Sequence, residues 1–349
     1  MNPYILSILL MGLGLGTTIT FASTHWLLAW VGLEMNTLAI LPLMAQHHHP
    51  RAVEATTKYF LTQSTAAATI MFASSTNAWL SGEWEIHHIT HPLPMTLVTL
   101  ALFLKIGLAP LHAWLPEVIQ GLDLTTGLIM STWQKLAPFA LLVQVVPNMP
   151  ALLLGLGTLS MLVGGWGGLN QTQLRKIMAY SSIAHLGWMV IIVQLSASLT
   201  ILSLLLYIFM TTSIFLMFKL LKSTSMNTLA ASWSKAPAMT ALAPLALLSL
   251  GGLPPLSGFM PKWLIIQELT KQDLGLVATL AALSALLSLF FYLRVCYSLT
   301  LTSSPNNVTG PLSWRLNEKQ AALPMALSTS LSLLLLPITP AIMSLTLTT

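Results

Sequence analysis

Long apolar runs almost free of charge follow one another along the whole chain, and they constrain its fold more than any motif does. Lys and Arg number 14 and Asp and Glu 9 in 349 residues, whereas a soluble chain of this length carries about 87 charged side chains. A helix needs about 20 residues to cross a bilayer, so the chain accommodates roughly 11 spans joined by short loops. The composition excludes a soluble globular fold and predicts an all-α, polytopic membrane protein.

Proline, glycine, asparagine and charge clusters bound eleven candidate spans. They cover residues 3–22, 25–45, 57–80, 94–119, 124–146, 150–169, 174–195, 198–220, 238–270, 274–299 and 323–347. The fourth and the ninth contain internal prolines, which remove a donor and clash with the preceding turn, so both are predicted to be broken helices. No basic segment precedes the first span, which is expected to be retained rather than cleaved as a signal.

A repeat is visible at the two broken helices. Gly107–Leu111 and the following Leu115-Pro116 recur as Gly252–Leu256 and Met260-Pro261, at an offset of 145 (252 minus 107). Five helices per repeat, an odd number, place the two copies in opposite membrane orientations, an arrangement found in many transporters. Chance similarity in Pro/Gly-rich sequence is the alternative. The predicted domains are a first five-helix repeat at 1–146 broken near 107–116, a second, inverted repeat at 150–299 broken near 252–261, and a loop with a C-terminal transmembrane helix at 300–349.

Lys and Arg segregate to one side of the predicted membrane. The side reached after an even number of spans holds Arg51, Lys58, Arg175, Lys176, Lys219, Lys222, Lys235, Arg294, Arg315 and Lys319. The loops of the other side hold only Lys271. Because basic loops stay on the cytoplasm-equivalent side, the N-terminus is predicted there and the C-terminus on the opposite side.

Three charged residues lie deep within predicted spans of the first repeat, away from the span ends. Glu34 is midway along the second span, Lys105 just precedes the break of the fourth, and Lys135 is near the middle of the fifth. An ionised carboxylate in hydrocarbon costs several kcal/mol unless it is paired or lines water, so the lysines are the expected partners of Glu34. Pairing favours the charged forms and desolvation the neutral ones, so this set can load and release protons. A purely structural salt bridge is the alternative.

The second break and two histidines add further candidates. Lys262 follows the second break at the position where the first repeat has Glu117. Broken helices expose backbone groups that can hold water, so both are candidate proton carriers, with a solvated surface role as the alternative for Glu117. His185 and His112 titrate near physiological pH and could connect the charged sites, although a buried histidine more often serves packing.

The remaining composition points away from other chemistry. Cys296 is the only cysteine, so an intrachain disulfide or an iron-sulfur cluster is excluded. His47, His48 and His49 are adjacent, and His87, His88 and His91 form a second cluster. Consecutive residues make poor metal cages and no carboxylate or thiol spacing accompanies them, so no metal site is predicted. The net charge of +5 lies mostly in short loops, which favours lipid headgroups over nucleic acid. Glycines at 164–168 lack a P-loop context and indicate close helix packing.

Four motifs carry a family resemblance that extends over the whole chain. They are RAVEATTKYFLTQ at 51–63, LKIGLAPLHAWLPE at 104–117, STWQKLAP at 131–138 and GLPPLSGFMPKW at 252–263. Together they resemble the subunit 2 family of mitochondrial NADH:ubiquinone oxidoreductase, respiratory complex I. These antiporter-like membrane-arm subunits are similar to Mrp-type cation/proton antiporter subunits.

The resemblance implies proton translocation coupled to electron transfer from NADH to ubiquinone in other subunits. It implies that Glu34 and Lys105 are the coupled pair of the first half, that Lys135 is the connecting lysine and that Lys262 is the lysine of the second broken helix. His185 then falls in a helix that carries polar groups along the central axis. FMN, iron-sulfur clusters and ubiquinone are then expected elsewhere, with no cofactor and no metal in this chain. The implied partners are other membrane-arm subunits and phospholipids, cardiolipin among them. The resemblance also implies that the chain does not function as a monomer.

The resemblance also implies a location in the mitochondrial inner membrane, with the N-terminus on the matrix side and the C-terminus in the intermembrane space. The bacterial pattern has fourteen helices, and the animal form lacks the first three, which fits the eleven spans counted here. A stand-alone cation/proton antiporter and a structural membrane scaffold are the alternative functions.

Overall fold

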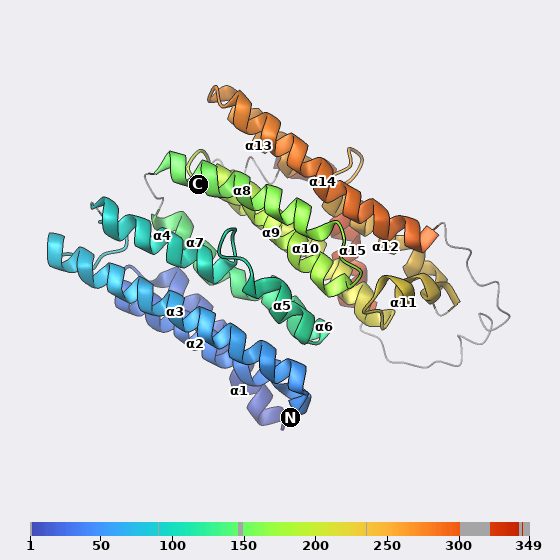
Figure 1. Cartoon of the computed structure of the whole chain (residues 1–349), viewed down its shortest axis with the longest axis horizontal. Coiled ribbons are helices and arrows are strands. Elements are labelled where there is room, and N and C mark those ends of the chain that lie inside the picture. Colours follow the sequence, from blue (N-terminus) through green and yellow to red (C-terminus); the bar gives the residue numbers. More distant parts are fainter. Residues whose placement is uncertain are drawn as a thin grey trace. The chain divides into compact units, whose positions relative to one another are not determined.

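The computed structural model divides the chain into two compact units, Met1–Leu152 and Leu153–Thr349. It describes residues 2–89, 91–145, 149–234, 236–300, 322–341 and 344. In this part of the chain the regular structure is helical, with two isolated β-bridges (Figure 1). The domain boundaries predicted from the sequence stay predictions.

The first unit is a bundle of antiparallel helices with α7 in its interior. Its helices are α1 (Pro3–Ala22), α2 (Trp26–Met44), α3 (Pro50–Ser81), α4 (Pro92–Ile106), α5 (Trp114–Gly121), α6 (Leu124–Ser131) and α7 (Trp133–Val145). A 3-10 turn, η1 (Gln46–His48), leads into α3. Helix α1 packs along α2, α3 packs along α4 and α5, and α7 contacts α1, α2 and α4 (Figure 1). Polar side chains on α7 therefore face three other helices rather than lipid.

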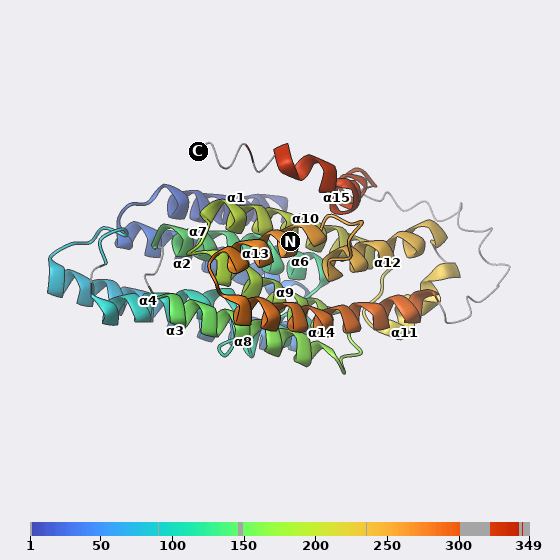
Figure 2. The ribbon, with the colours of Figure 1, turned by 90° about the horizontal axis from the view of Figure 1, so that it is seen from above.

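The second unit is built around α9, most of whose side chains are buried. Its elements are α8 (Pro150–Gly168, which begins at the unit boundary), α9 (Leu174–Ile192), α10 (Ala197–Leu220), α11 (Met226–Ala230), η2 (Ala231–Ser234), α12 (Pro237–Gly251), α13 (Phe259–Lys271), α14 (Gly275–Thr300), α15 (Ala322–Leu334) and η4 (Leu336–Ile338). Helix α9 contacts α10, α13 and α14 (Figure 2). Trp188 and Ile192 of α9 pack against Ile265 and Leu269 of α13 in the apolar core.

Five described helices are long and apolar enough to cross a membrane: α1, α2, α8, α10 and α14. Helices α4, α12 and Leu323–Leu334 are apolar but shorter. The predicted class, an all-helical polytopic membrane protein, is confirmed at this level. Helix α3 begins at Pro50 rather than at 57, because the His49 side chain accepts from the Arg51 N–H and caps an earlier start.

Both predicted breaks are present. Helix α4 ends at Gly107 (φ +84°), whose N–H donates to Phe103 O, and α12 ends at Gly252 (φ +79°), whose N–H donates to Leu248 O. A left-handed residue closes a helix in this way, and glycine takes that conformation without a Cβ penalty. After the first break the chain becomes helical again at α5, and after the second at α13. Both breaks are therefore short, and each lies within one unit.

The structure has two interruptions where the sequence predicts continuous spans. The predicted span 124–146 is divided at Thr132, whose side-chain hydroxyl donates to Leu128 O (2.7 Å) alongside its own N–H. Such back-bonding bends helices, and Pro138 removes a further bond in the next turn. The predicted span 323–347 was also wrong as one helix, because α15 ends at Leu334 just before Pro337. Residues 301–321 of the predicted loop, with Arg315 and Lys319, and Lys235 lie outside the described residues.

Each unit contains the same pairing of two loops, a feature the sequence analysis did not predict. In the first unit Trp26 N–H donates to Trp84 O and Ile86 N–H to Thr24 O, at 3.1 and 2.9 Å. In the second, Leu174 N–H donates to Thr224 O and Met226 N–H to Thr172 O, both at 3.1 Å. In both units the segment before the second helix pairs antiparallel with the segment after the third.

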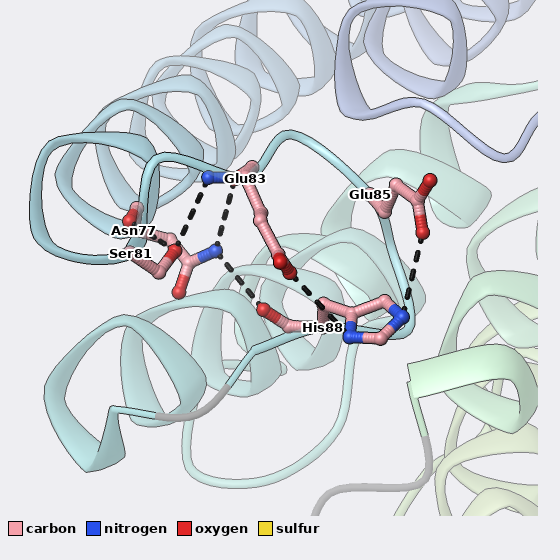
Figure 3. Close-up of polar contacts among 5 residues, drawn as sticks. All are labelled: Asn77, Ser81, Glu83, Glu85 and His88. Carbon is pink, nitrogen blue, oxygen red and sulfur yellow. Dashed lines mark hydrogen bonds and ion pairs between the residues drawn. The ribbon is translucent and has the colours of Figure 1, made fainter.

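The loop after α3 is held by polar contacts (Figure 3). The Asn77 side-chain amide donates to Glu83 O and His88 O, both at 3.3 Å. The His88 ring lies 3.4 Å from a carboxylate oxygen of Glu83 and 3.4 Å from one of Glu85. The loop therefore folds back on itself and brings two carboxylates to His88.

The glycines near the end of α8, Gly164, Gly165, Gly167 and Gly168, serve close packing, as predicted. A Cβ on Gly164 would lie 2.6 Å from the backbone nitrogen of Ala184 on α9, and one on Gly168 would lie 2.7 Å from the Phe291 ring on α14. Small residues let helix backbones approach in this way in membrane proteins.

Candidate functional site

The end of α4 places Lys105 in the interior of the first unit. The last carbonyls of a helix lack intrahelical partners. Here the Trp114 indole donates to Leu104 O (3.1 Å) and the Gln63 amide donates to Lys105 O (3.3 Å). These side chains from α5 and α3 fix the break against its neighbours. The Lys105 side chain is 6% exposed, and its Nζ makes no hydrogen bond to the described part of the chain.

Lys105 and Lys135 line one small internal cavity. Its volume is about 10 Å³, room for about one water molecule. Lys135, in the first turn of α7, is 2% exposed. The remaining lining residues are Leu33, Asn36, Thr37, Tyr59, Gln63, Ile106, Trp114, Leu115, Met130, Gln134 and Pro138. The fold therefore brings two of the predicted site residues, 30 positions apart in sequence (135 minus 105), to one polar space.

A chain of neutral side chains crosses the wall of this cavity. The Tyr59 hydroxyl donates to Gln134 Oε1 (3.3 Å), and Gln134 Nε2 donates to Asn36 Oδ1 (3.1 Å). These three residues come from α3, α7 and α2 and are almost fully buried. Buried polar groups need partners, so these two hydrogen bonds fix the orientation of the Gln134 amide next to Lys135.

Glu34 is near the lysines but not in contact with them. Its carboxylate interacts electrostatically with Lys105 and with Tyr59. One oxygen accepts from the Thr37 hydroxyl at 3.3 Å, and the other is buried with no hydrogen bond to any described residue. Glu34 and Lys105 thus interact across a gap, without an ion pair between them in the described chain.

In the second unit Lys262 and His185 also share a cavity. This cavity of about 10 Å³ is lined by both residues and by Trp188, Met189, Ser203, Met210, Gly258, Pro261 and Ile265. The His185 ring lies 5.7 Å from the Tyr207 ring, centroid to centroid. Lys262, 9% exposed, donates from Nζ to the carbonyl oxygens of Gly251 (2.8 Å) and Leu250 (3.4 Å).

The two remaining candidates lie outside these cavities. His112 is half-buried between α4 and α5, with Nδ1 at 3.2 Å from Pro110 O. Glu117 is 55% exposed, and its carboxylate lies 2.7 Å from Lys58 Nζ, which is also 2.7 Å from Glu54. Helix α3 is about 48 Å long, longer than a hydrocarbon core of about 30 Å, and the Lys58 side chain near its start is 42% exposed.

Replacing Glu117 with Gln should make the Lys58 amine more reactive. The hydrogen bond that Lys58 donates to Glu117, and secondly the one that it donates to Glu54, raise the pKa of Lys58 above its usual range. Removal of the stronger contact lowers that pKa and increases the neutral fraction at mildly alkaline pH, so labelling by an amine-directed reagent should accelerate. Mass spectrometry of the labelled chain measures the rate. Glu54→Gln should give a smaller increase, and a slower reaction in Glu117→Gln would contradict the prediction.

The sequence analysis missed the neutral members of the first cavity: Asn36, Tyr59, Gln63 and Gln134. A signal was present, because polar side chains within apolar spans are costly unless they find partners. Among the described residues no group of three or more His, Cys, Asp or Glu is placed to hold a metal ion.

A family model described as NADH:quinone oxidoreductase/Mrp antiporter, transmembrane, matches residues 23–288. The chain belongs to this family. A second model, for the C-terminus of NADH dehydrogenase subunit 2, matches residues 289–343. NADH-ubiquinone oxidoreductase chain 2 of Tetraodon nigroviridis is 69% identical over 345 residues, which is 99% of each chain.

Two solved structures share the fold. A chain of respiratory complex I from Thermus thermophilus with bound aureothin is 28% identical with a TM-score of 0.80, and the match covers 96% of this chain and 80% of that one. A chain of the Mrp complex from Dietzia sp. is 15% identical with a TM-score of 0.82, and the match covers 97% and 76%. At 15% identity the second likeness concerns the fold alone.

Proposed function

We propose that the chain is a core membrane-arm subunit of NADH:ubiquinone oxidoreductase and takes part in proton translocation across the mitochondrial inner membrane. The family membership and the 69% identity to NADH-ubiquinone oxidoreductase chain 2 support the assignment. Electron transfer from NADH to ubiquinone, with its FMN and iron-sulfur clusters, takes place in other subunits. The chain works in contact with further membrane-arm subunits and phospholipids.

One observation carries the proposed mechanism: Lys105 and Lys135 line the same buried cavity, with Glu34 close enough to act on Lys105 through its charge. A buried lysine is costly in its charged form, so a modest change in the field of Glu34 can shift its protonation. Motion of Glu34 toward or away from Lys105 then drives a proton toward Lys135. The water-sized space between the lysines suits such a transfer.

Lys262 and His185 act in the second unit as the corresponding proton-carrying pair. Their shared cavity supports this role. His112 and Glu117 take lesser parts near the first break, where Glu117 is exposed and can exchange protons with solvent.

The membrane arrangement proposed for this function has eleven spans in two inverted repeats and a C-terminal helix. The matched breaks support the repeats, since α4 and α12 both span 15 residues and begin at proline. The matched loop pairings of the two units support them as well. The Lys/Arg bias favours an N-terminus on the matrix side and a C-terminus in the intermembrane space.

Glu34→Gln in the assembled complex tests this mechanism. The amide keeps the size of the side chain but removes the charge that acts on Lys105. We expect a lower proton-to-electron ratio at normal assembly, measured by proton uptake into vesicles during NADH oxidation. Glu83→Gln is the matched control, because that carboxylate is exposed in a loop. A normal ratio in Glu34→Gln would remove Glu34 from the mechanism.

A stand-alone cation/proton antiporter remains the second candidate, favoured by the likeness to the Mrp fold. The purified chain in liposomes discriminates between the two. A stand-alone antiporter should exchange Na⁺ for protons without other subunits, whereas a complex I subunit should show no exchange alone and should migrate only in a large assembly.

A further inference from the structure

The carbonyl end of α12 has a different donor from the carbonyl end of α4. Its Nζ donates to the last two carbonyls of α12, Gly251 O at 2.8 Å and Leu250 O at 3.4 Å. In the first unit the carbonyls at the end of α4 are occupied by neutral donors, the Trp114 indole and the Gln63 amide. At the end of α12, by contrast, the donor is an ammonium group.

The carbonyl end of a helix is a suitable place for a buried cation. The unpaired carbonyls there carry partial negative charge, equivalent to about half an elementary charge for the whole helix end. Within the described chain Lys262 forms no ion pair with a carboxylate, and its Nζ donates to the two α12 carbonyls. The α12 carbonyls therefore stabilise the protonated form of Lys262, as the charge of Glu34 does for Lys105.

Gly252 controls access to these carbonyls. It lies directly after Gly251, at φ +79°. A Cβ built on it would lie 2.9 Å from Cδ, 3.0 Å from Nζ and 3.2 Å from Cε of Lys262. The corresponding Gly107 has a similar φ of +84°, but the atoms nearest to its Cβ would belong to Trp114 and Leu115, at 3.3 Å and 3.5 Å.

We propose that Gly252 is a positioning residue for Lys262. Because Gly252 has no side chain, the Lys262 ammonium can reach the carbonyl end of α12. The inference rests on the proposed function, in which Lys262 carries protons. The α12 carbonyls hold the protonated amine between transfers, and release of a proton accompanies its departure from them. A side chain at 252 displaces the amine and separates it from this partner.

Gly252→Ala in the assembled complex tests the inference, with Gly82→Ala as the matched control. Gly82 has nearly the same backbone angle, φ +78°, and nothing lies within 4 Å of its added Cβ. Both substitutions therefore strain the backbone alike, and only the first meets Lys262. We expect Gly252→Ala to lower the proton-to-electron ratio to that of Lys262→Ala, whereas Gly82→Ala keeps the wild-type ratio.

Thermal unfolding of the same complexes separates positioning from general damage. Gly252→Ala should lower the unfolding temperature more than Gly82→Ala does. This additional decrease, the excess, should disappear when both glycine substitutions are compared in a Lys262→Ala background. If Gly252→Ala alone fails to assemble, recovery of assembly in the Gly252→Ala, Lys262→Ala double variant supports the contact, and no recovery overturns it. An excess that persists without the lysine also overturns the inference.

The two proposals fail in different ways. A normal proton-to-electron ratio in Lys262→Ala would sink the proposed proton role of Lys262. A normal ratio in Gly252→Ala, together with a reduced ratio in Lys262→Ala, would sink only the positioning role of Gly252.

Discussion

Lys105→Met should produce a complex that assembles normally but translocates fewer protons per electron. Met is close to Lys in length and apolar, so it fills the same space without the ammonium group. Proton transfer by a positioned side chain is worth about 10²–10⁴ in rate, so we expect proton flux through this subunit to fall at least about tenfold. Stability should be unchanged or slightly higher, because the Lys105 Nζ is buried without a hydrogen bond to the described chain.

Lys219→Met is the matched control for this prediction. Lys219 lies in the last turn of α10, as Lys105 does in α4, but it is exposed. Proton uptake and NADH oxidation measured together give the ratio for both variants. A wild-type ratio in an assembled Lys105→Met complex would remove Lys105 from the pathway.

A structural scaffold makes a different prediction for the same residues. If the charges serve only helix packing, replacing both members of the pair at once, as in the Glu34→Gln, Lys105→Met double variant, should preserve pumping. The proposed mechanism predicts that the double variant pumps no better than Lys105→Met alone. The two predictions can be separated because Glu34 and Lys105 form no ion pair in the described structure, so neither substitution breaks one.

Much of the fold was predictable because its breaks have local causes. Gly107 and Gly252 stand where a left-handed residue must end a helix, and the prolines around them cannot continue it. The interruption at Thr132 was missed, since it depends on a hydroxyl competing for one carbonyl within an otherwise regular apolar run.

The charged residues of the site were predictable, whereas their partners were not. Glu34, Lys105, Lys135 and Lys262 stand out because charge is rare in apolar spans. The partners of Lys262 are backbone carbonyls, which every residue has and which leave no mark in a sequence. Gln134 and its partners Tyr59 and Asn36 are 75 and 98 positions apart, and neutral side chains give no indication of which distant helix they face.

Gly258→Ala should have the largest effect on stability of any small substitution in the second unit. Its Cβ would lie 1.8 Å from the backbone oxygen of Ser249 and 3.0 Å from Met210 Sδ. A flexible side chain could move aside, but Ser249 O belongs to the last turn of α12 and accepts the Gly252 N–H at 3.0 Å. Overpacking of this kind costs about 1–3 kcal/mol and occasionally more, and a rigid backbone neighbour places Gly258 at the upper end. We expect a marked loss of assembled complex, measured by native electrophoresis and thermal unfolding.

Gly155→Ala is the matched control for Gly258→Ala. Gly155 lies within α8, is exposed, and has nothing within 4 Å of an added Cβ. Alanine is favoured over glycine inside a helix by about 0.5–1 kcal/mol, so this variant should be as stable as the wild type or more so. Gly258 also lines the cavity of Lys262 and His185, so the contact tested is the one that sets the start of α13 against the end of α12. Normal assembly and unfolding of Gly258→Ala would mean that the two helix ends lie farther apart, and that the α12 carbonyls are not within reach of Lys262.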